Sequence, residues 1–119
     1  MILVIDDEEA IRETLYDILT MAGHEVTVAS GGREGLDYFE RDRYDLVITD
    51  LRMAGMSGWD VAWAVKESHP DIPVILITGV VTQLDEEKLR ECKIDRVIPK
   101  PFSIELIFRA LSETLKQSS

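Results

Sequence analysis

Cysteine, proline, aromatic residues and positive charge are all scarce in this chain of 119 residues. The single cysteine, Cys92, excludes an internal disulfide, so we expect a reducing cytoplasm and an ordinary half-buried thiol rather than a nucleophile. Wholly apolar runs reach only four or five residues, such as Val74–Ile77, which excludes a segment that spans a bilayer. We expect no signal peptide, because Met1 leads straight into a short apolar run and then into Asp6 and Asp7.

Basic residues number 13 against 23 acidic ones, which gives a net charge of −10. Such a surface repels a phosphate backbone, so we expect no direct binding of nucleic acid by this domain and no membrane association. The acidity has two explanations that net charge does not separate. It either serves solubility or is partly concentrated where a divalent cation binds.

Five short apolar runs recur along the chain without strict alternation, which is typical of strands buried on both faces. They are Ile2–Ile5, Val26–Ala29, Leu46–Ile48, Val74–Ile77 and Val97–Ile98. After each run the apolar residues have helical spacing, which predicts helices over 11–22, 32–41, 58–68, 83–91 and 104–115. Gly23 is expected to end the first helix, and Ser103 is expected to be the N-cap of the last. The helix over 83–91 is weak and acidic. Because strands and helices alternate strictly along the chain, the sequence predicts one α/β domain over residues 1–119. It is a flavodoxin-like (βα)5 three-layer α/β/α sandwich, with a parallel five-stranded sheet of order 2-1-3-4-5.

Polar residues stand where four of the predicted strands end. These are Asp6-Asp7, Thr49-Asp50, Thr78-Gly79 and Lys100-Pro101. Taken singly, each is an ordinary turn, cap or solvated residue. Because ligands of such sheets bind at the carboxyl ends of the strands, their joint placement predicts a common cleft with three carboxylates, one hydroxyl and one ammonium.

Three converging carboxylates require a proton or a cation, since two of them about 4 Å apart repel by roughly 4 kcal/mol at an effective dielectric constant near 20. Oxygen ligands in a partly open site favour Mg²⁺, for which Mn²⁺ can substitute. With the cation bound, one carboxylate can act as a nucleophile toward phosphorus. Lys100 and Thr78 then offer a cation and a hydroxyl donor to the phosphoryl oxygens, and Gly79 leaves the approach open.

These residues resemble those of the receiver domains of two-component response regulators, over essentially the whole chain. The matching stretches are ILVIDDE at 2–8, DLVITDLRM at 45–53, GMSG at 55–58, PVILITG at 73–79 and PKPF at 99–102. The resemblance implies a phosphorelay function, in which the chain is a switch that assists its own phosphorylation and dephosphorylation and is not a turnover enzyme. It also implies a sensor histidine kinase or phosphotransfer protein as donor, and a downstream output domain or protein as target.

The resemblance also implies roles for individual residues. Asp50 receives the phosphoryl group, and Thr78 and Lys100 contact its oxygens. Mg²⁺ is bound by Asp7, Asp50 and the backbone carbonyl of Arg52, with Asp6 acting through a bound water. Lys100-Pro101 is expected to be cis, and Thr78 is expected to draw the following loop toward the phosphate. The surface built from helix 4, strand 5 and helix 5 then changes its affinity for partners, one of which is a second copy in a phosphorylation-dependent homodimer.

Four features depart from the family pattern. Ala54 replaces a common proline, Val97 replaces the usual aromatic residue, and Lys93-Ile94 replaces Gly-Ala before the last strand. Arg52 and Val80 occupy variable positions beside the site that influence phosphoryl lifetime. The geometry of switching is therefore left open, as are the cognate kinase, the output and the lifetime of the phosphoryl group.

Three other functions remain as alternatives. A haloacid-dehalogenase-like phosphatase needs a second aspartate where Arg52 stands, and a flavodoxin-like flavin carrier needs a phosphate cradle where Asp7-Glu8-Glu9 repels phosphate. A phosphorylation-independent docking module is favoured only by Val97. Trp59 and Trp63 are expected to pack on one helix face or to be half-exposed. The chain ends at Lys116-Gln117-Ser118-Ser119, which leaves open a free-standing receiver or a receiver excised from a longer regulator.

Overall fold

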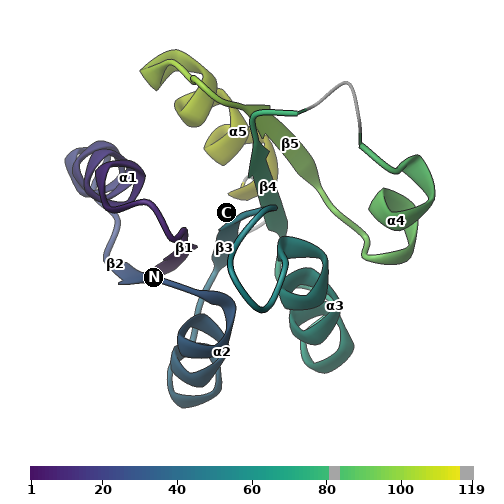
Figure 1. The fold of residues 1–119 in the computed structure, drawn as a ribbon. Helices are drawn as coiled ribbons and strands as arrows, with labels where there is room; N and C mark the ends of the chain where they lie inside the picture. The colour runs from purple at the N-terminus through teal and green to yellow at the C-terminus, as the bar shows by residue number, and fades with distance from the viewer. Residues whose placement is uncertain (81–83, 116–119) are drawn as a thin grey trace.

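The computed structural model describes residues 1–80 and 84–115. Five parallel strands form one sheet in the order β2-β1-β3-β4-β5 (Figure 1). Their bounds are β1 Ile2–Ile5, β2 Val26–Ala29, β3 Leu46–Asp50, β4 Val74–Thr78 and β5 Arg96–Pro99. The predicted fold class and strand order are confirmed. The last three strands are longer than predicted because polar end residues pair in the sheet, as Asp50 does with Ile77 and Thr78 does with Pro99.

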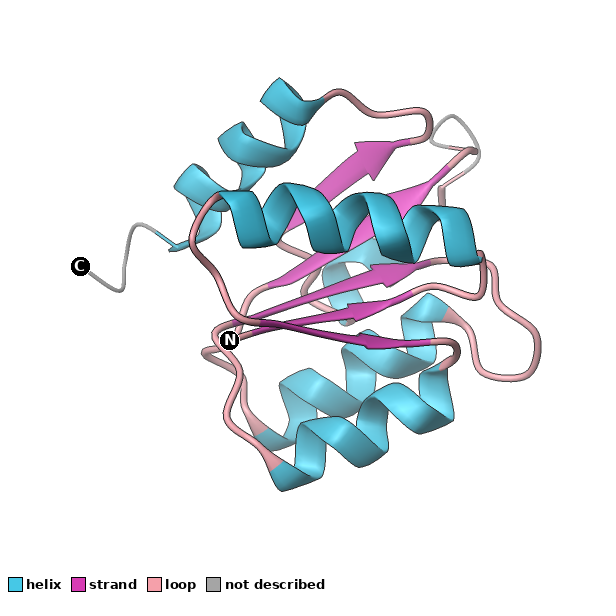
Figure 2. Cartoon of the chain, turned by 90° about the vertical axis from the view of Figure 1, so that its left-hand side faces the viewer, coloured by secondary structure: helices cyan, strands magenta, loops and turns pink. Residues whose placement is uncertain are grey.

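In the described residues, five helices cover the two faces of the sheet, as Figures 1 and 2 show. Their bounds are α1 Glu9–Met21, α2 Gly32–Arg41, α3 Gly58–Ser68, α4 Glu86–Glu91 and α5 Ile104–Leu115. Helix α4 begins later than the predicted residue 83, which lies outside the described residues. Asp85 sets this start, because its side chain accepts hydrogen bonds from the backbone N–H groups of Glu87 and Lys88. The expected cap of α5 is confirmed, since the Ser103 hydroxyl accepts from the N–H of Leu106 at 3.1 Å.

Alternate residues of the strands enter two separate hydrophobic cores. On one face, Val4, Ile48 and Ile77 pack with α1 and α5 through residues such as Leu15 and Ile107. The opposite core, which lies against α2 and α3, receives the intervening strand residues. Because both faces are buried, the strands lack an exposed polar side, and this explains their unbroken apolar runs.

The sequence predicted that Gly23 ends α1, and the structure tests this prediction. Gly23 follows α1 with φ of +94°, a conformation that favours glycine, as the expected stop requires. The terminal residues 116–119 lie outside the described residues. In residues 1–80 and 84–115, no helix is both long enough and apolar enough to cross a membrane.

Candidate functional site

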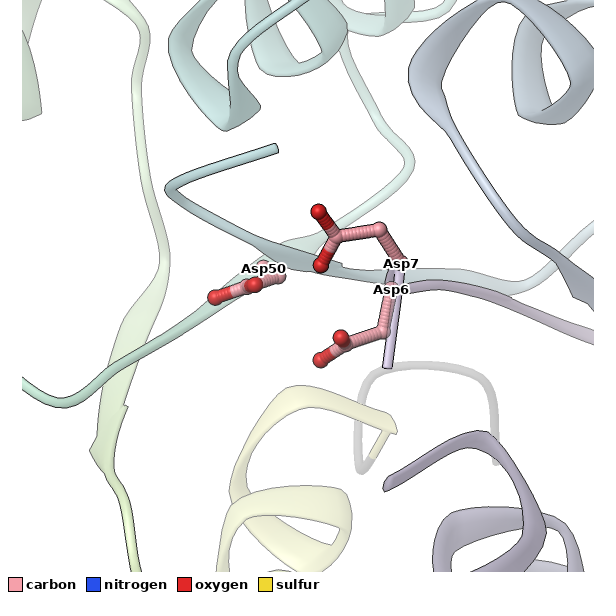
Figure 3. Close-up of side chains that lie close together, drawn as sticks. All are labelled: Asp6, Asp7 and Asp50. Atoms are coloured by element: carbon pink, nitrogen blue, oxygen red, sulfur yellow. The ribbon is translucent and has the colours of Figure 1, made fainter. Parts of the chain in front are cut away.

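The carboxyl ends of β1 and β3 bring three aspartates together (Figure 3). Asp6 and Asp7 follow β1, and Asp50 is the last residue of β3. One carboxylate oxygen from each lies within 4.8 Å of the other two. Asp6 and Asp50 are buried, with exposed fractions of 1% and 6%, whereas Asp7 is exposed. The cluster is therefore deep on one side and open to solvent on the other.

Hydrogen bonds on both sides fix the turn that carries Asp6. Its N–H donates to Ala29 of the neighbouring strand at 3.1 Å, and its backbone carbonyl accepts from Arg12 Nη1 at 2.8 Å. Its Oδ1 accepts the N–H of Glu8 at 2.9 Å. The second carboxylate oxygen, Oδ2, makes no hydrogen bond within the described residues.

The backbone after Asp50 is held closely against the start of α3. Leu51 donates its N–H to Ile77 at 3.0 Å and accepts from the N–H of Gly58 at 2.8 Å. A Cβ on Gly58 would overlap the Asp50 carbonyl oxygen and lie 2.9 Å from the Cα of Leu51. Sequence reasoning assigned Gly58 no part in the site, although the GMSG stretch at 55–58 was the available signal.

The Lys100 ammonium lies among three carboxylates. Its Nζ is 2.9 Å from Glu8 Oε1, 3.2 Å from Asp6 Oδ2 and 3.4 Å from Asp50 Oδ2. The predicted approach of Lys100 to the two aspartates is thus present, whereas sequence reasoning missed the contact with Glu8. The Lys100-Pro101 peptide bond is cis, as the resemblance implied.

Thr78 stands beside this group at the end of β4 and is buried, with an exposed fraction of 2%. Its hydroxyl accepts the N–H of Val80 at 3.2 Å, and its carbonyl accepts the N–H of Lys100 at 2.9 Å. Within the described residues, Thr78 makes no hydrogen bond to Asp50. The backbone of β4 therefore links Thr78 to Lys100, while the hydroxyl is oriented by the loop that follows the strand.

Burial governs the protonation of the site. It raises the pKa values of Asp6 and Asp50, and the nearby Asp6 charge raises that of Asp50 further. For Lys100, burial alone would lower the pKa. The hydrogen bond to Glu8 and the charges of Asp6 and Asp50 outweigh it, so the pKa of Lys100 is raised. The ammonium stays charged and only partly compensates the three carboxylates.

The donor set fits a divalent cation that prefers oxygen ligands. Asp6 Oδ2 is buried and accepts no hydrogen bond, so its contact with Lys100 is an ion pair without hydrogen-bond geometry. This oxygen would gain from a metal ion or a metal-bound water, because a buried acceptor without a partner is costly. Three clustered carboxylates with one open side are the arrangement that Mg²⁺ or Mn²⁺ binds in proteins.

A cleft of about 560 Å³ opens on the exposed side of the cluster. Its lining includes Asp7, Arg52, Ala54, Trp59 and Val80. These residues come from the ends of β1, β3 and β4 and from the start of α3. A ligand therefore has room to approach the carboxylates from this side.

The remaining predictions have mixed outcomes. Trp59 is half-buried and Trp63 is 54% exposed, which agrees with the expected packing of helix 58–68. Cys92 is buried rather than half-buried, and burial raises the pKa of its thiol, which lowers its reactivity. Val97 lies in β5 beside Leu76, and the acidic helix α4 is solvated, with no fully buried residue.

The five-stranded parallel sheet of order 2-1-3-4-5, with the acidic cluster at its carboxyl edge, defines a flavodoxin-like doubly wound α/β domain. The family model described as the response regulator receiver domain matches residues 2–112. The chain belongs to this family.

Curated relatives share about a third of its residues. A response regulator named MprA from Mycolicibacterium vanbaalenii is 30% identical over 118 residues, which are 99% of this chain and 51% of the relative. Response regulator RR06 from Streptococcus pneumoniae is 33% identical over 116 residues, covering 98% of this chain and 53% of the relative. The chain thus spans about half the length of the curated relatives it matches.

Solved structures agree over almost the whole chain. The chemotaxis protein CheY4 of Vibrio cholerae superposes with a TM-score of 0.91 at 28% identity, covering 96% of this chain and 97% of that one. A receiver domain protein from Clostridium thermocellum gives a TM-score of 0.88 at 30% identity, covering 98% and 94%. The likeness therefore extends over both layers of helices and the whole sheet.

Proposed function

We propose that residues 1–119 form one receiver domain that accepts a phosphoryl group on Asp50 from a phosphohistidine. The donor is a sensor histidine kinase or a phosphotransfer protein in the cytoplasm. The observation that carries the proposal is the contact set of Lys100, whose ammonium lies 3.4 Å from the buried Asp50 carboxylate and 3.2 Å from Asp6. A cation held against a buried carboxylate at the edge of an open cleft suits the transfer of an anionic group.

Each site residue has a specific part in the transfer. Asp7, Asp50 and the backbone carbonyl of Arg52 would bind Mg²⁺ directly, and Asp6 would bind it through a water. When bound, the cation neutralises charge on the phosphoryl oxygens. Lys100 contacts one of these oxygens, and the Thr78 hydroxyl donates to another after it turns from Val80. The buried position of Asp50, which is 6% exposed, limits the contact of its carboxylate with bulk water.

The reaction exchanges one bond to phosphorus for another. An Asp50 carboxylate oxygen attacks in line and forms an O–P bond, while the N–P bond to the donor imidazole breaks. The imidazole nitrogen keeps the electron pair of that bond. The ring leaves as neutral imidazole if its other nitrogen carries a proton, and otherwise it takes up a proton from solvent. Hydrolysis reverses the state, because attack of water on phosphorus regenerates the Asp50 carboxylate and releases inorganic phosphate. The domain is consequently a switch and not a turnover enzyme.

The phosphorylated state changes a surface remote from Asp50. Thr78 ends β4, and its hydroxyl accepts a hydrogen bond from the N–H of Val80. Movement of Thr78 toward the phosphoryl group would shift Val80 and alter the surface formed by α4, β5 and α5. That surface would then bind an output domain, a separate protein or a second copy of the chain with a different affinity.

Intact-protein mass spectrometry after incubation with acetyl phosphate tests the proposal. We expect a gain of one phosphoryl group with Mg²⁺, no gain with EDTA, and no gain in Asp50→Asn. Asp71→Asn, which neutralises an exposed aspartate away from the cluster, is the matched control and should be modified like the wild type. A wild type that acquires no adduct and binds no beryllofluoride would overturn the proposal in favour of a phosphorylation-independent docking module.

A further inference from the structure

The carboxylate closest to the Lys100 ammonium belongs to Glu8, not to either buried aspartate. Glu8 Oε1 is 2.9 Å from Nζ, whereas Asp6 Oδ2 is at 3.2 Å and Asp50 Oδ2 at 3.4 Å. The three partners differ sharply in exposure. The Glu8 side chain is 60% exposed, whereas those of Asp6 and Asp50 are 1% and 7% exposed.

The local backbone explains why the Glu8 side chain is available to Lys100. Glu8 is the N-cap residue of α1, but its carboxylate makes no capping hydrogen bond to that helix. Its N–H donates to Asp6 Oδ1 at 2.9 Å, which fixes the main chain and sends the side chain toward Lys100. The backbone of Lys100 is likewise fixed by its N–H bond to Thr78. Only the two long side chains have to move for the pair to separate.

We propose that Glu8 is a positioning residue that holds Lys100 in the unphosphorylated state and releases it when the phosphoryl group arrives on Asp50. This inference rests on the proposed function. An ammonium group has three N–H donors, and within the described residues Glu8 is the one carboxylate that accepts a hydrogen bond from Lys100, while Asp6 and Asp50 contact it as ion pairs. A phosphoryl oxygen that contacts Lys100 therefore competes with Glu8 for the ammonium group.

Glu8 is the partner that gives way at least cost. An exposed carboxylate regains water when its ion pair opens, whereas Asp6 Oδ2 is buried without a hydrogen bond and would lose its ion pair with Lys100 without gaining water. For the same reason the hold is weak and sensitive to salt. Glu8 thus adjusts how readily the site accepts an anion and does not block it.

Beryllofluoride, which imitates the phosphoryl group, provides the test when it is titrated in the presence of Mg²⁺. Trp59 lines the cleft, so its fluorescence reports binding once Trp63→Phe has been introduced into every variant. We expect Glu8→Gln to tighten beryllofluoride binding about two- to fivefold at low salt. The gain should shrink as sodium chloride is raised, because added salt weakens the ion pair in the protein that keeps Glu8.

Glu9→Gln is the matched control. It removes the same charge one residue later, at an exposed position on the first turn of α1 that has no contact with Lys100. We expect its affinity to stay within the error of the wild-type value. Equal gains in both variants would overturn the inference, because they would show a general effect of net charge.

A double-mutant cycle of Glu8→Gln with Lys100→Met provides a second readout. Urea unfolding gives the free energy of unfolding of each variant, and from these the coupling free energy of the two residues. We expect coupling in EDTA and none when Mg²⁺ and beryllofluoride are bound. The same coupling in both states, or none in EDTA, would overturn the inference. Failure of the wild type to bind beryllofluoride would overturn the proposed function as well, whereas normal wild-type binding with an unchanged Glu8→Gln would overturn only the role of Glu8.

Discussion

Lys93 ends α4 in the conformation with which Gly23 ends α1. Both residues have positive φ, +54° for Lys93 and +94° for Gly23. In both turns the N–H of this residue bonds to the carbonyl three residues back, and the following N–H bonds to the carbonyl five residues back. The bonding pattern is that of a Schellman motif, whose left-handed position is usually occupied by glycine. Lys93-Ile94 thus forms a standard helix end with an unfavourable residue.

Replacement of Lys93 by glycine should therefore stabilise the protein. The left-handed conformation costs a non-glycine residue roughly 1–2 kcal/mol, and the extra chain entropy of glycine offsets part of the gain. We expect the free energy of unfolding to rise by about 0.5–1 kcal/mol in urea denaturation. Gly23→Ala is the reciprocal control and should lower it by a similar amount, since no other atom lies within 4 Å of its Cβ position. An unchanged Lys93→Gly variant would show that the lysine is not strained.

Gly58→Ala should destabilise the fold and slow phosphorylation together. The added methyl group would overlap the carbonyl oxygen of Asp50, and backbone atoms have little freedom to move aside. We expect a loss of about 1–3 kcal/mol in the free energy of unfolding, as for other overpacked sites. The rate of adduct formation with acetyl phosphate should fall because Asp50 shifts. Gly79→Ala is the control for stability, since nothing lies within 4 Å of its Cβ position.

Without metal, the contribution of Asp6 and Asp50 to the stability of the protein should fall as pH rises above the ordinary carboxyl pKa of 3.8. The pKa values of Asp6 and Asp50 are raised by burial, so the folded state binds these two protons more tightly than the unfolded state does. Their contribution is complete below pH 3.8 and is lost as pH rises through the folded-state values.

The variant Asp50→Asn isolates this effect. In EDTA at pH 7 it should be more stable than the wild type by roughly 1–2 kcal/mol, because one buried charge is removed. The difference should shrink as pH falls through the raised pKa of Asp50, because the wild-type carboxyl then takes up a proton. Thermal unfolding across this pH range measures it, and Asp71→Asn should show no such trend. A wild type that becomes steadily more stable from pH 4 to pH 7 relative to Asp50→Asn would contradict the prediction.

Magnesium should stabilise the folded protein through the acidic cluster. A ligand at ten times its dissociation constant adds about 1.4 kcal/mol to the free energy of unfolding. We expect thermal unfolding of the wild type to shift upward with Mg²⁺, and the shift to be largely lost in Asp7→Asn. Glu9→Gln removes an equal charge nearby and should keep the shift. Sodium chloride at matched ionic strength should not reproduce it, and an equal response to both salts would indicate simple screening.

The sequence by itself determined the architecture. Unbroken apolar runs such as Ile2–Ile5 and Val74–Ile77 alternate with amphipathic helices, and this order permits few arrangements because parallel strands need helical crossovers on both faces. The sequence also located the cluster, since residues that directly follow buried parallel strands have to meet at one edge of the sheet. Asp6, Asp7, Asp50 and Lys100 could be selected on that ground alone.

Only the tertiary structure decided which contacts these residues make. Glu8 is 92 positions from Lys100 along the chain, so its own neighbourhood does not signal their ion pair. The GMSG stretch marks Gly58, but it does not indicate how closely Gly58 approaches the carbonyl of Asp50. Such contacts depend on the register of β1 against β3 and on how tightly α3 packs beneath the sheet edge. The difference in burial between Asp6 and Asp7, adjacent residues of the same type, arises in the same way. Asp6 directly follows β1, bonds to Ala29 through its N–H and is buried, whereas Asp7 lies in the bend that comes next and is exposed.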